Sequence, residues 1–187
     1  MMIETANLRL VPCDLIHFEA ILRDEKELAT LLHVKLAEEW LGFAAAKEAM
    51  APAYEHLKSH PSILGWWTYL FIHVADNTLI GLGGFKGAPD ERGLVEIGYA
   101  IAPSYRRRGL ATEAASGMID YAFSHEHVTR VVAHTLPEKN PSTMVLQKVW
   151  MKFGGLTIDP DDGEVWSWSL SRDENQQAAA ESSRQEN

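Results

Sequence analysis

Residues 95–123 limit the possible folds more than any other part of the sequence. Residues 95–102 are rich in apolar side chains and end at Pro103, which lacks the N–H needed to continue strand pairing, so they predict a β-strand. From residue 110 onward, apolar residues recur at intervals of three and four, as on one face of a helix: Leu110, Ala114, Met118, Ile119, Ala122 and Phe123. The pattern therefore predicts a strand that passes through a short turn into a helix.

The turn between this strand and this helix, residues 106–111, has the composition of an anion site. The first N–H groups of a helix have no partner within the helix, and the helix dipole places positive charge at the same end. Gly109 would let a ligand approach the backbone, and the three arginines before it can pair with phosphate. We expect a phosphate-bearing ligand here.

Three segments around this turn resemble one protein family. Residues 105–114, YRRRGLATEA, resemble the acetyl-CoA pyrophosphate loop, (Gln/Arg)-x-x-Gly-x-(Gly/Ala), of the GNAT N-acetyltransferase superfamily. Residues 96–99, EIGY, and 140–148, NPSTMVLQK, are similar to the RimJ/RimL-like branch, which contains the ribosomal-protein N-terminal acetyltransferases. The resemblance covers roughly residues 5–170 and is strongest between residues 95 and 148.

The rest of the pattern predicts a mixed α+β fold. Helices are expected after Asp14 and over residues 44–57, where Pro52 should kink the helix or mark its start, and again over residues 142–150. Strands are expected at residues 7–12, 66–74, 79–85, 130–135, 151–156 and 164–170. These elements predict a largely antiparallel sheet with helices on both faces. The resemblance implies a GNAT-like twisted sheet of about six to seven strands, with a parallel strand–helix–strand crossover at the centre.

Domain organisation follows from the same pattern. We expect residues 1–171 to form one GNAT-like acetyltransferase domain. Residues 172–187 are polar and low in complexity, which predicts a disordered tail.

Charge and cysteine content narrow the classes of partner. The formal net charge of −9 disfavours a nucleic-acid partner, whose phosphates attract basic surfaces. It is compatible with a cationic amine substrate, or with solubility alone. Cys13 is the single cysteine, so no disulfide framework is expected. The N-terminus lacks the pattern of a signal peptide, and the apolar run at residues 63–75 is too short to span a bilayer, so we expect a cytoplasmic protein that does not bind membranes.

The resemblance implies which residues contact acetyl-CoA. The backbone amides from Arg107 to Thr112 would surround the pyrophosphate, the backbone around Ile101 would pair with the pantetheine arm, and Asn140 would bind the same arm. The predicted cofactor-binding set is Ile101, Arg106, Arg107, Arg108, Gly109, Leu110, Ala111, Thr112 and Asn140.

Two residues are candidates for proton transfer. Glu96 is the candidate general base, because a carboxylate on the central strand can receive the ammonium proton; its alternative role is a surface salt bridge. Ser142 matches the serine that in relatives protonates the leaving thiolate, although a residue here can equally serve as a helix cap. His134 has two open roles as well, a cleft residue or a satisfied strand histidine.

One residue departs from the family pattern. Trp150 stands where relatives have a glycine that ends the helix in a left-handed conformation. Tryptophan adopts that conformation only at a cost, so we expect a different turn.

The sequence thus predicts an acyltransferase. It would transfer the acetyl group of acetyl-CoA to a primary amine of a small molecule or of a protein N-terminus, by direct attack with general-base help and without a metal. The alternative is a non-catalytic domain that binds or senses acyl-CoA. The sequence leaves open the acceptor and the oligomeric state, monomer or homodimer.

Overall fold

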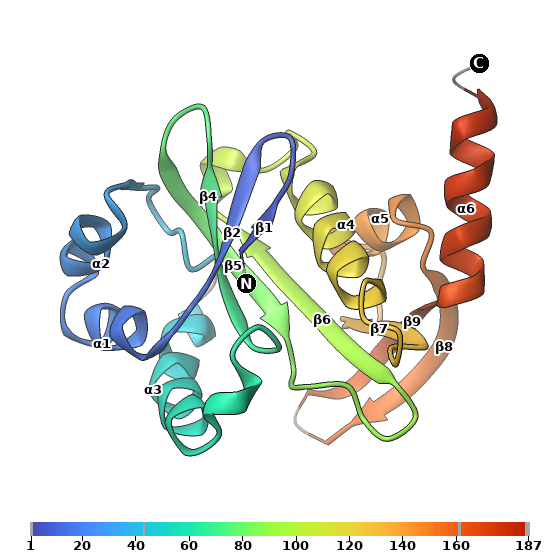
Figure 1. The fold of residues 1–187 in the computed structure, drawn as a ribbon, viewed down its shortest axis with the longest axis horizontal. Coiled ribbons are helices and arrows are strands. Elements are labelled where there is room, and N and C mark those ends of the chain that lie inside the picture. Colours follow the sequence, from blue (N-terminus) through green and yellow to red (C-terminus); the bar gives the residue numbers. More distant parts are fainter. Residues whose placement is uncertain (1, 43, 161, 186–187) are drawn as a thin grey trace.

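The computed structural model describes residues 2–42, 44–160 and 162–185 (Figure 1). In this part of the chain nine strands form one sheet, of which eight follow the order β1-β2-β4-β5-β6-β7-β9-β8. They are β1 (Ile3–Glu4), β2 (Leu8–Pro12), β4 (Thr68–His73), β5 (Thr78–Phe85), β6 (Leu94–Ile101), β7 (Arg130–Thr135), β8 (Lys152–Asp159) and β9 (Gly163–Ser171). The short strand β3 (Lys35–Leu36) pairs with β5 in parallel, and β6 pairs with β7 in parallel, whereas the other pairs are antiparallel.

Helices cover the sheet from both sides (Figure 1). On one side lie α1 (Leu15–Arg23), α2 (Glu25–Leu32) and α3 (Ala44–Ser59), and on the other lie α4 (Leu110–Phe123) and α5 (Pro141–Lys148). Two 3-10 turns, η1 (Pro61–Ile63) and η2 (Pro103–Tyr105), precede β4 and the arginine turn. The buried side chains of α4 include the predicted apolar face, so the helical pattern of the sequence corresponds to its packing face.

Strand β6 divides its pairing between two neighbours. Residues Leu94 to Glu96 pair with Arg130 to Val132 of β7, whereas residues Ile97 to Ile101 pair with Phe85 to Gly81 of β5. After Glu96, β6 and β7 therefore separate, and the β7-facing edge of β6 forms no ladder with a described strand.

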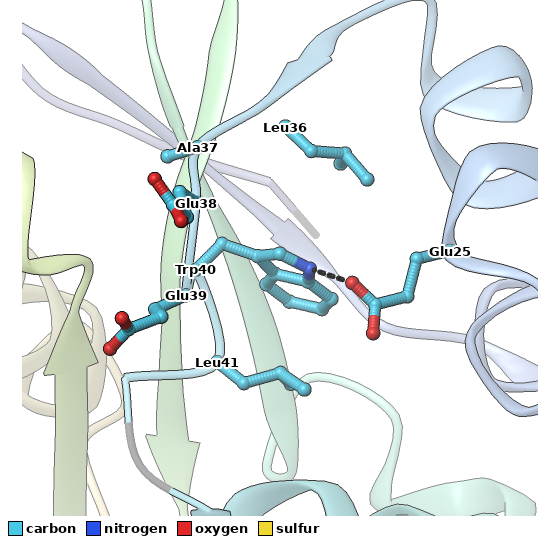
Figure 2. Close-up of a pocket in the computed structure, with 7 residues that line it drawn as sticks. All are labelled: Glu25, Leu36, Ala37, Glu38, Glu39, Trp40 and Leu41. Atoms are coloured by element: carbon cyan, nitrogen blue, oxygen red, sulfur yellow. Dashed lines mark hydrogen bonds between the residues drawn. The ribbon is translucent and has the colours of Figure 1, made fainter.

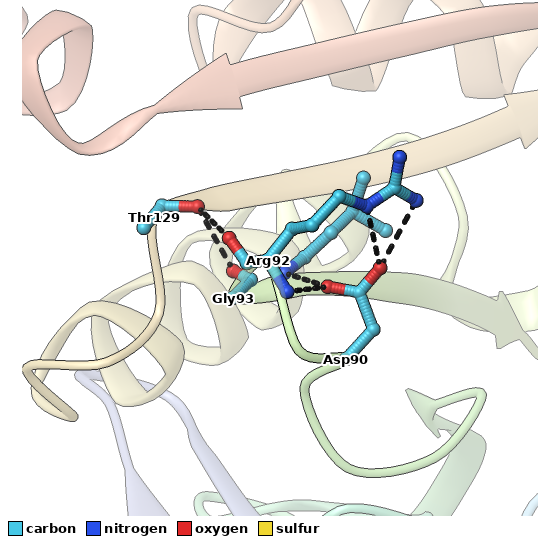
Figure 3. A network of polar contacts seen from close by, with 5 residues as sticks. Asp90, Arg92, Gly93 and Thr129 are labelled. Atoms are coloured by element: carbon cyan, nitrogen blue, oxygen red, sulfur yellow. Dashed lines mark hydrogen bonds and ion pairs between the residues drawn. The ribbon is translucent and has the colours of Figure 1, made fainter.

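A polar network fixes the first half of β6 against β7 (Figure 3). The Asp90 carboxylate accepts hydrogen bonds from the backbone N–H groups of Arg92 and Leu94, at 2.9 and 2.8 Å. The Thr129 hydroxyl donates to the Arg92 carbonyl at 2.7 Å, and the Gly93 carbonyl accepts from the Thr129 N–H at 2.8 Å. A side chain at Gly93, which has φ +75°, would collide with the carbonyl oxygen of His127. The network fixes the register of β6 against β7, and this pairing ends at Glu96.

The predicted fold class is confirmed, and most predicted elements occur within a few residues of their expected positions. The sheet has more strands than the expected six to seven, because β1 and β3 are two residues long and give no periodic pattern. Pro52 lies inside α3.

The C-terminal segment differs from the expected disordered tail. The structure places Arg172–Gln185 in helix α6, which extends away from the body (Figure 1). Its first turn is held in two ways. The Glu174 carboxylate accepts from the N–H and hydroxyl of Ser171, and the Arg172 guanidinium donates to the carbonyls of Phe123, His125 and Val128. The Ser171–Glu174 pair is a local contact at the helix start, of the Ser-x-x-Glu type, whereas the Arg172 contacts depend on residues distant in sequence and cannot be inferred from composition.

The expected change of turn at Trp150 is wrong. Trp150 has φ +64° and occupies the left-handed position itself. Its N–H donates to the Gln147 carbonyl at 3.1 Å, and the Met151 N–H donates to the Leu146 carbonyl at 3.0 Å, which is the Schellman pattern of a helix end. Leu146 and Met151 are both buried, and their packing across this turn maintains the conformation in spite of the side chain at Trp150.

Replacing Trp150 by glycine should therefore stabilise the protein. The left-handed conformation costs a bulky residue about 1–2 kcal/mol, which the glycine variant would no longer lose. Part of this gain in stability is offset by the greater conformational freedom of glycine in the unfolded chain. Because the Trp150 side chain is 54% exposed, little packing is lost. We expect Trp150→Gly to raise the free energy of unfolding by about 0.5–1 kcal/mol in urea titrations. A loss of stability would mean that the indole contributes packing that outweighs the strain.

Glu113 joins the N-terminal strands to α4. Its Oε1 accepts hydrogen bonds from the Thr5 hydroxyl and the Asn7 N–H, both at 2.6 Å, and its Oε2 accepts from the Asn7 side chain at 3.0 Å. Burial alone would raise the pKa of Glu113, but the hydrogen bonds from Thr5 and Asn7 outweigh it and hold that pKa below the ordinary value. The ionised form of Glu113 is therefore the form that the fold favours.

A lowered pKa in the folded state predicts a specific pH dependence. The contribution of Glu113 to the free energy of unfolding is fully present above the ordinary glutamate pKa of about 4.3. This contribution is lost as the pH falls through the lower pKa of Glu113 in the folded state. Glu113→Gln should lower the free energy of unfolding by about 1 kcal/mol at pH 7. The wild type should then lose more stability than this variant between pH 6 and pH 3 in urea titrations. Parallel curves would show that the Glu113 carboxylate is not linked to folding.

Candidate functional site

The arginine turn exposes a row of backbone N–H groups. Arg107 has φ +60° and Gly109 has φ +80°, and these left-handed residues alternate with Arg108 just before α4. Such alternation turns successive N–H groups toward one side and forms a concave anion site. No N–H group of residues 107–112 donates to another described residue, and a side chain at Gly109 would meet nothing within 4 Å. The loop therefore offers free donors and open space.

Arg106 and Arg108 have partners within the chain. The Arg106 guanidinium donates to the carbonyls of Ile101 and Gly42, at 2.9 and 3.2 Å. The Arg108 guanidinium lies over the Tyr105 ring, 4.7 Å from its centre. Arg106 therefore holds the loop against β6, and the Ile101 carbonyl, expected to face the pantetheine arm, already accepts a hydrogen bond. All of residues 106–109 are exposed.

Glu96 lies at the point where β6 and β7 separate, and it has two partners. Its Oε1 accepts from Lys86 Nζ at 2.7 Å and lies 3.0 Å from His134 Nδ1. The Glu96 and His134 side chains are mostly shielded, at 17% and 21% exposure, whereas Lys86 is more exposed. Burial alone would lower the pKa of Lys86, but the hydrogen bond and charge of Glu96 outweigh it and raise that pKa.

Tyr99 and the start of α5 lie on the opposite face of the same strand. Alternation along β6 places Glu96 and Ala100 on one face and Tyr99 on the other. The Tyr99 hydroxyl donates to the Ser142 carbonyl at 3.4 Å, and burial raises the pKa of Tyr99. Asn140 caps α5, because its Oδ1 accepts from the Thr143 N–H at 3.1 Å. The capping role considered for this position is confirmed for Asn140.

Residues 36–42 form a wall over the Glu96 face of the sheet. Gly42 packs so closely on Ala100 that an added side chain would meet it at 2.7 Å. Trp40 is buried, and its Nε1 donates to Glu25 Oε2 at 2.8 Å (Figure 2). Glu38 and Glu39 point to the opposite side of the segment from Trp40 (Figure 2). The hollow beside Trp40 includes no residue of β6 or of the arginine turn, so it is not the candidate reaction site.

The fold, the arginine turn and the separated strands correspond to one class of protein. Residues 7–152 match the family of acetyltransferase (GNAT) domains. This match spans most of the chain, so the protein belongs to the GNAT acetyltransferase family and is an acyltransferase. A non-catalytic acyl-CoA-binding domain, the alternative function, is not supported.

The chain is similar to individual proteins of this family in sequence and in fold. The chain is 30% identical over 168 residues to YjdG of Bacillus subtilis (strain 168), described as an uncharacterized N-acetyltransferase, and the match covers 90% of this chain and 96% of YjdG. An acetyltransferase from Salmonella typhimurium that modifies the N-terminal serine of ribosomal protein L7/L12 superposes with a TM-score of 0.66 at 15% identity, covering 91% and 99% of the two chains. A RimL ribosomal L7/L12 α-N-protein acetyltransferase in complex with coenzyme A gives 0.64 at 15% identity, covering 93% and 99%. These two structures show a shared fold.

The structure brings some of the predicted site residues together and keeps others apart. The loop residues 106–112 form one group at the start of α4, whereas Glu96 and Ser142 lie on opposite sides of β6 and do not contact each other. Sequence reasoning missed two contacts of Glu96. The contact with Lys86 depends on the register of β5 against β6, where the Lys86 N–H donates to the Glu96 carbonyl at 3.0 Å, and the contact with His134 depends on the pairing of β6 with β7 and spans 38 residues. Among the described residues, no cluster of three His, Cys, Asp or Glu side chains could hold a metal, and no helix could cross a membrane.

A bulky residue at Gly109 tests the role of the loop. Gly109→Val places a side chain in the open space in front of the free N–H groups and also strains a left-handed residue. We expect the dissociation constant for acetyl-CoA to rise at least tenfold in calorimetric titrations, while the melting temperature falls by only a few degrees.

A second glycine provides the matched control for this variant. Gly163 has φ +74°, and an added side chain there also meets nothing within 4 Å. Gly163→Val should show similar strain with unchanged acetyl-CoA affinity. Equal loss of affinity in both variants would mean that the loop does not face the ligand.

Proposed function

We propose that this protein acetylates a primary amine at the point where β6 and β7 separate, with acetyl-CoA held by the arginine turn. The observation that carries the proposal is the combination of free N–H groups at residues 107–112 with an unpaired edge of β6 beyond Glu96. An unpaired strand edge can receive an extended amide-bearing chain as an added strand. GNAT acetyltransferases use acetyl-CoA, and pantetheine is such a chain.

The residues present fit acetyl-CoA. Its pyrophosphate would meet the N–H groups of Arg107 to Thr112 and the charge of Arg107, whose side chain is exposed. The Asn140 side-chain NH₂ group is left for the pantetheine arm, because the cap uses only its Oδ1. Bound acetyl-CoA supplies an acetyl group already activated as a thioester.

We assign the two proton transfers of the reaction to two residues. Glu96 contributes to deprotonating the incoming ammonium, and the Ser142 hydroxyl donates a proton toward the leaving sulfur. Glu96 lies on one face of β6, and Ser142 of α5 lies on the other, beside Tyr99, so in this proposal the base and the acid act from different sides. The proposed reaction uses no metal ion.

We propose that the acceptor approaches over the Glu96 face. That face carries Glu38 and Glu39 on the wall segment and belongs to a chain with a net charge of −9, which suits an ammonium-bearing acceptor. The relatives that act on ribosomal protein L7/L12 make a protein N-terminus one acceptor class, and a small amine is the other. We further propose a cytoplasmic monomer or homodimer whose catalytic domain is residues 1–171.

Ligand-dependent melting and thiol release test this function. A ligand that binds only the native state at a hundredfold excess over Kd adds about 2.7 kcal/mol of stability, so acetyl-CoA should raise the melting temperature by several degrees. Release of free thiol should then depend on an acceptor in a panel of small amines, aminoglycosides and peptides beginning with serine or alanine. Absence of any melting shift at millimolar acetyl-CoA would overturn the cofactor assignment.

A further inference from the structure

A histidine on β7 contacts the carboxylate of Glu96. Val132 of β7 is the pairing partner of Glu96, and His134 lies two residues further along β7 on the same face. Glu96 and His134 therefore face each other across the start of the separation of β6 and β7. His134 Nδ1 lies 3.0 Å from Glu96 Oε1.

This contact determines which nitrogen of His134 carries the proton. A carboxylate only accepts hydrogen bonds, so Nδ1 must donate, and in the neutral ring the lone pair is then on Nε2. No described residue forms a hydrogen bond with His134 Nε2. Nε2 of the His134 ring is therefore free to accept a proton.

The hydrogen bonds around the pair leave His134 Nε2 as the available proton acceptor. Lys86 already donates to the same Glu96 oxygen at 2.7 Å, and its raised pKa keeps it protonated, so Lys86 is not a base. Glu96 Oε1 is thus engaged by both Lys86 and His134, whereas imidazole is the side chain best suited to general-base catalysis near neutral pH. The other neighbours are Ser167, paired with His134 on β9, and Asp159 and Asp162, which act on Lys86 from the β8–β9 turn.

We propose that His134 Nε2 is the general base of this acetyltransferase and that Glu96 orients the ring and stabilises its protonated form. The inference rests on the proposed function and divides the proton-transfer role there given to Glu96. The arrangement follows the same logic as a carboxylate–histidine pair in a nucleophile–base–carboxylate triad, with the acceptor amine in place of the nucleophile.

The proposed acetyl transfer begins with the removal of one proton from the acceptor. The acceptor ammonium gives one proton to His134 Nε2, and the freed nitrogen lone pair attacks the thioester carbonyl carbon. The C–N bond forms and the C–S bond breaks, with its electron pair leaving on sulfur. The nitrogen's second proton replaces the one that the Ser142 hydroxyl gives to the leaving sulfur, so the products are the amide, the thiol and a protonated His134 that releases its proton to solvent.

Nuclear magnetic resonance of the full-length protein with ¹⁵N-labelled histidine tests the tautomer without any turnover. At neutral pH the proton of His134 should be on Nδ1 in the wild type, and Glu96→Gln should remove this preference, because its amide can donate as well as accept. A proton on Nε2 of the wild type at neutral pH would overturn the proposal.

Kinetics against pH tests the role in catalysis. With acetyl-CoA and the best acceptor of the panel above, kcat/KM of the wild type should rise with pH as the general base of the free enzyme loses its proton. His134→Gln should lower kcat/KM at pH 7 at least a hundredfold and remove this rise, whereas its acetyl-CoA melting shift should stay. Glu96→Gln should cost about as much, and the double variant should be little worse than either.

The control and the second variant keep these outcomes distinct. His127→Gln changes an exposed histidine outside the site and should leave the profile unchanged, and His134→Asn should repeat the result if His134→Gln folds poorly. Wild-type rates and profile in both His134 variants would overturn the role of His134 while leaving the acetyltransferase function intact. Loss of the acetyl-CoA melting shift in the wild type would instead refute the proposed function.

Discussion

The separation of β6 from β7 after Glu96 is the constraint on which the rest of the structure depends. A parallel pair that ends after three residues leaves one strand edge without a ladder partner among the described strands, and the protein must hold that edge open. Asp90 and Thr129 fix the paired half, and Arg106 ties the far end of β6 to the wall at Gly42. Both ends of the strand are therefore anchored by side chains, and the gap between them is a property of the framework.

The two chemical tasks are placed by different elements around this gap. The proposed phosphate-binding loop belongs to the start of α4, where unpaired N–H groups are a consequence of helix geometry. The proposed bases Glu96 and His134 belong to β6 and β7, whereas the proposed acid Ser142 belongs to α5, on the Tyr99 side of β6. Substitutions that alter cofactor affinity and those that alter proton transfer should thus be largely separable.

Sequence reasoning reached the parts of the structure that are local in the chain. The strand, the arginine turn and the helix from Leu110 are contiguous, so periodicity and the motif were sufficient to identify them. Residue pairs distant in sequence were not predictable, as in the contact of His134 with Glu96, because it requires the register of two strands. Trp150 shows a third case, in which packing of Leu146 and Met151 imposes a conformation that the residue alone disfavours.

The contact of Glu113 with Asn7 has a consequence for how the chain matures during synthesis. The two residues are 106 positions apart, so the N-terminal segment leaves the ribosome well before its partner exists. At roughly 5–20 residues per second this delay is on the order of 5–20 s, during which β1 and β2 lack the helix that anchors them. The N-terminal strands therefore lack their anchor until translation has passed α4, the helix that follows the arginine turn.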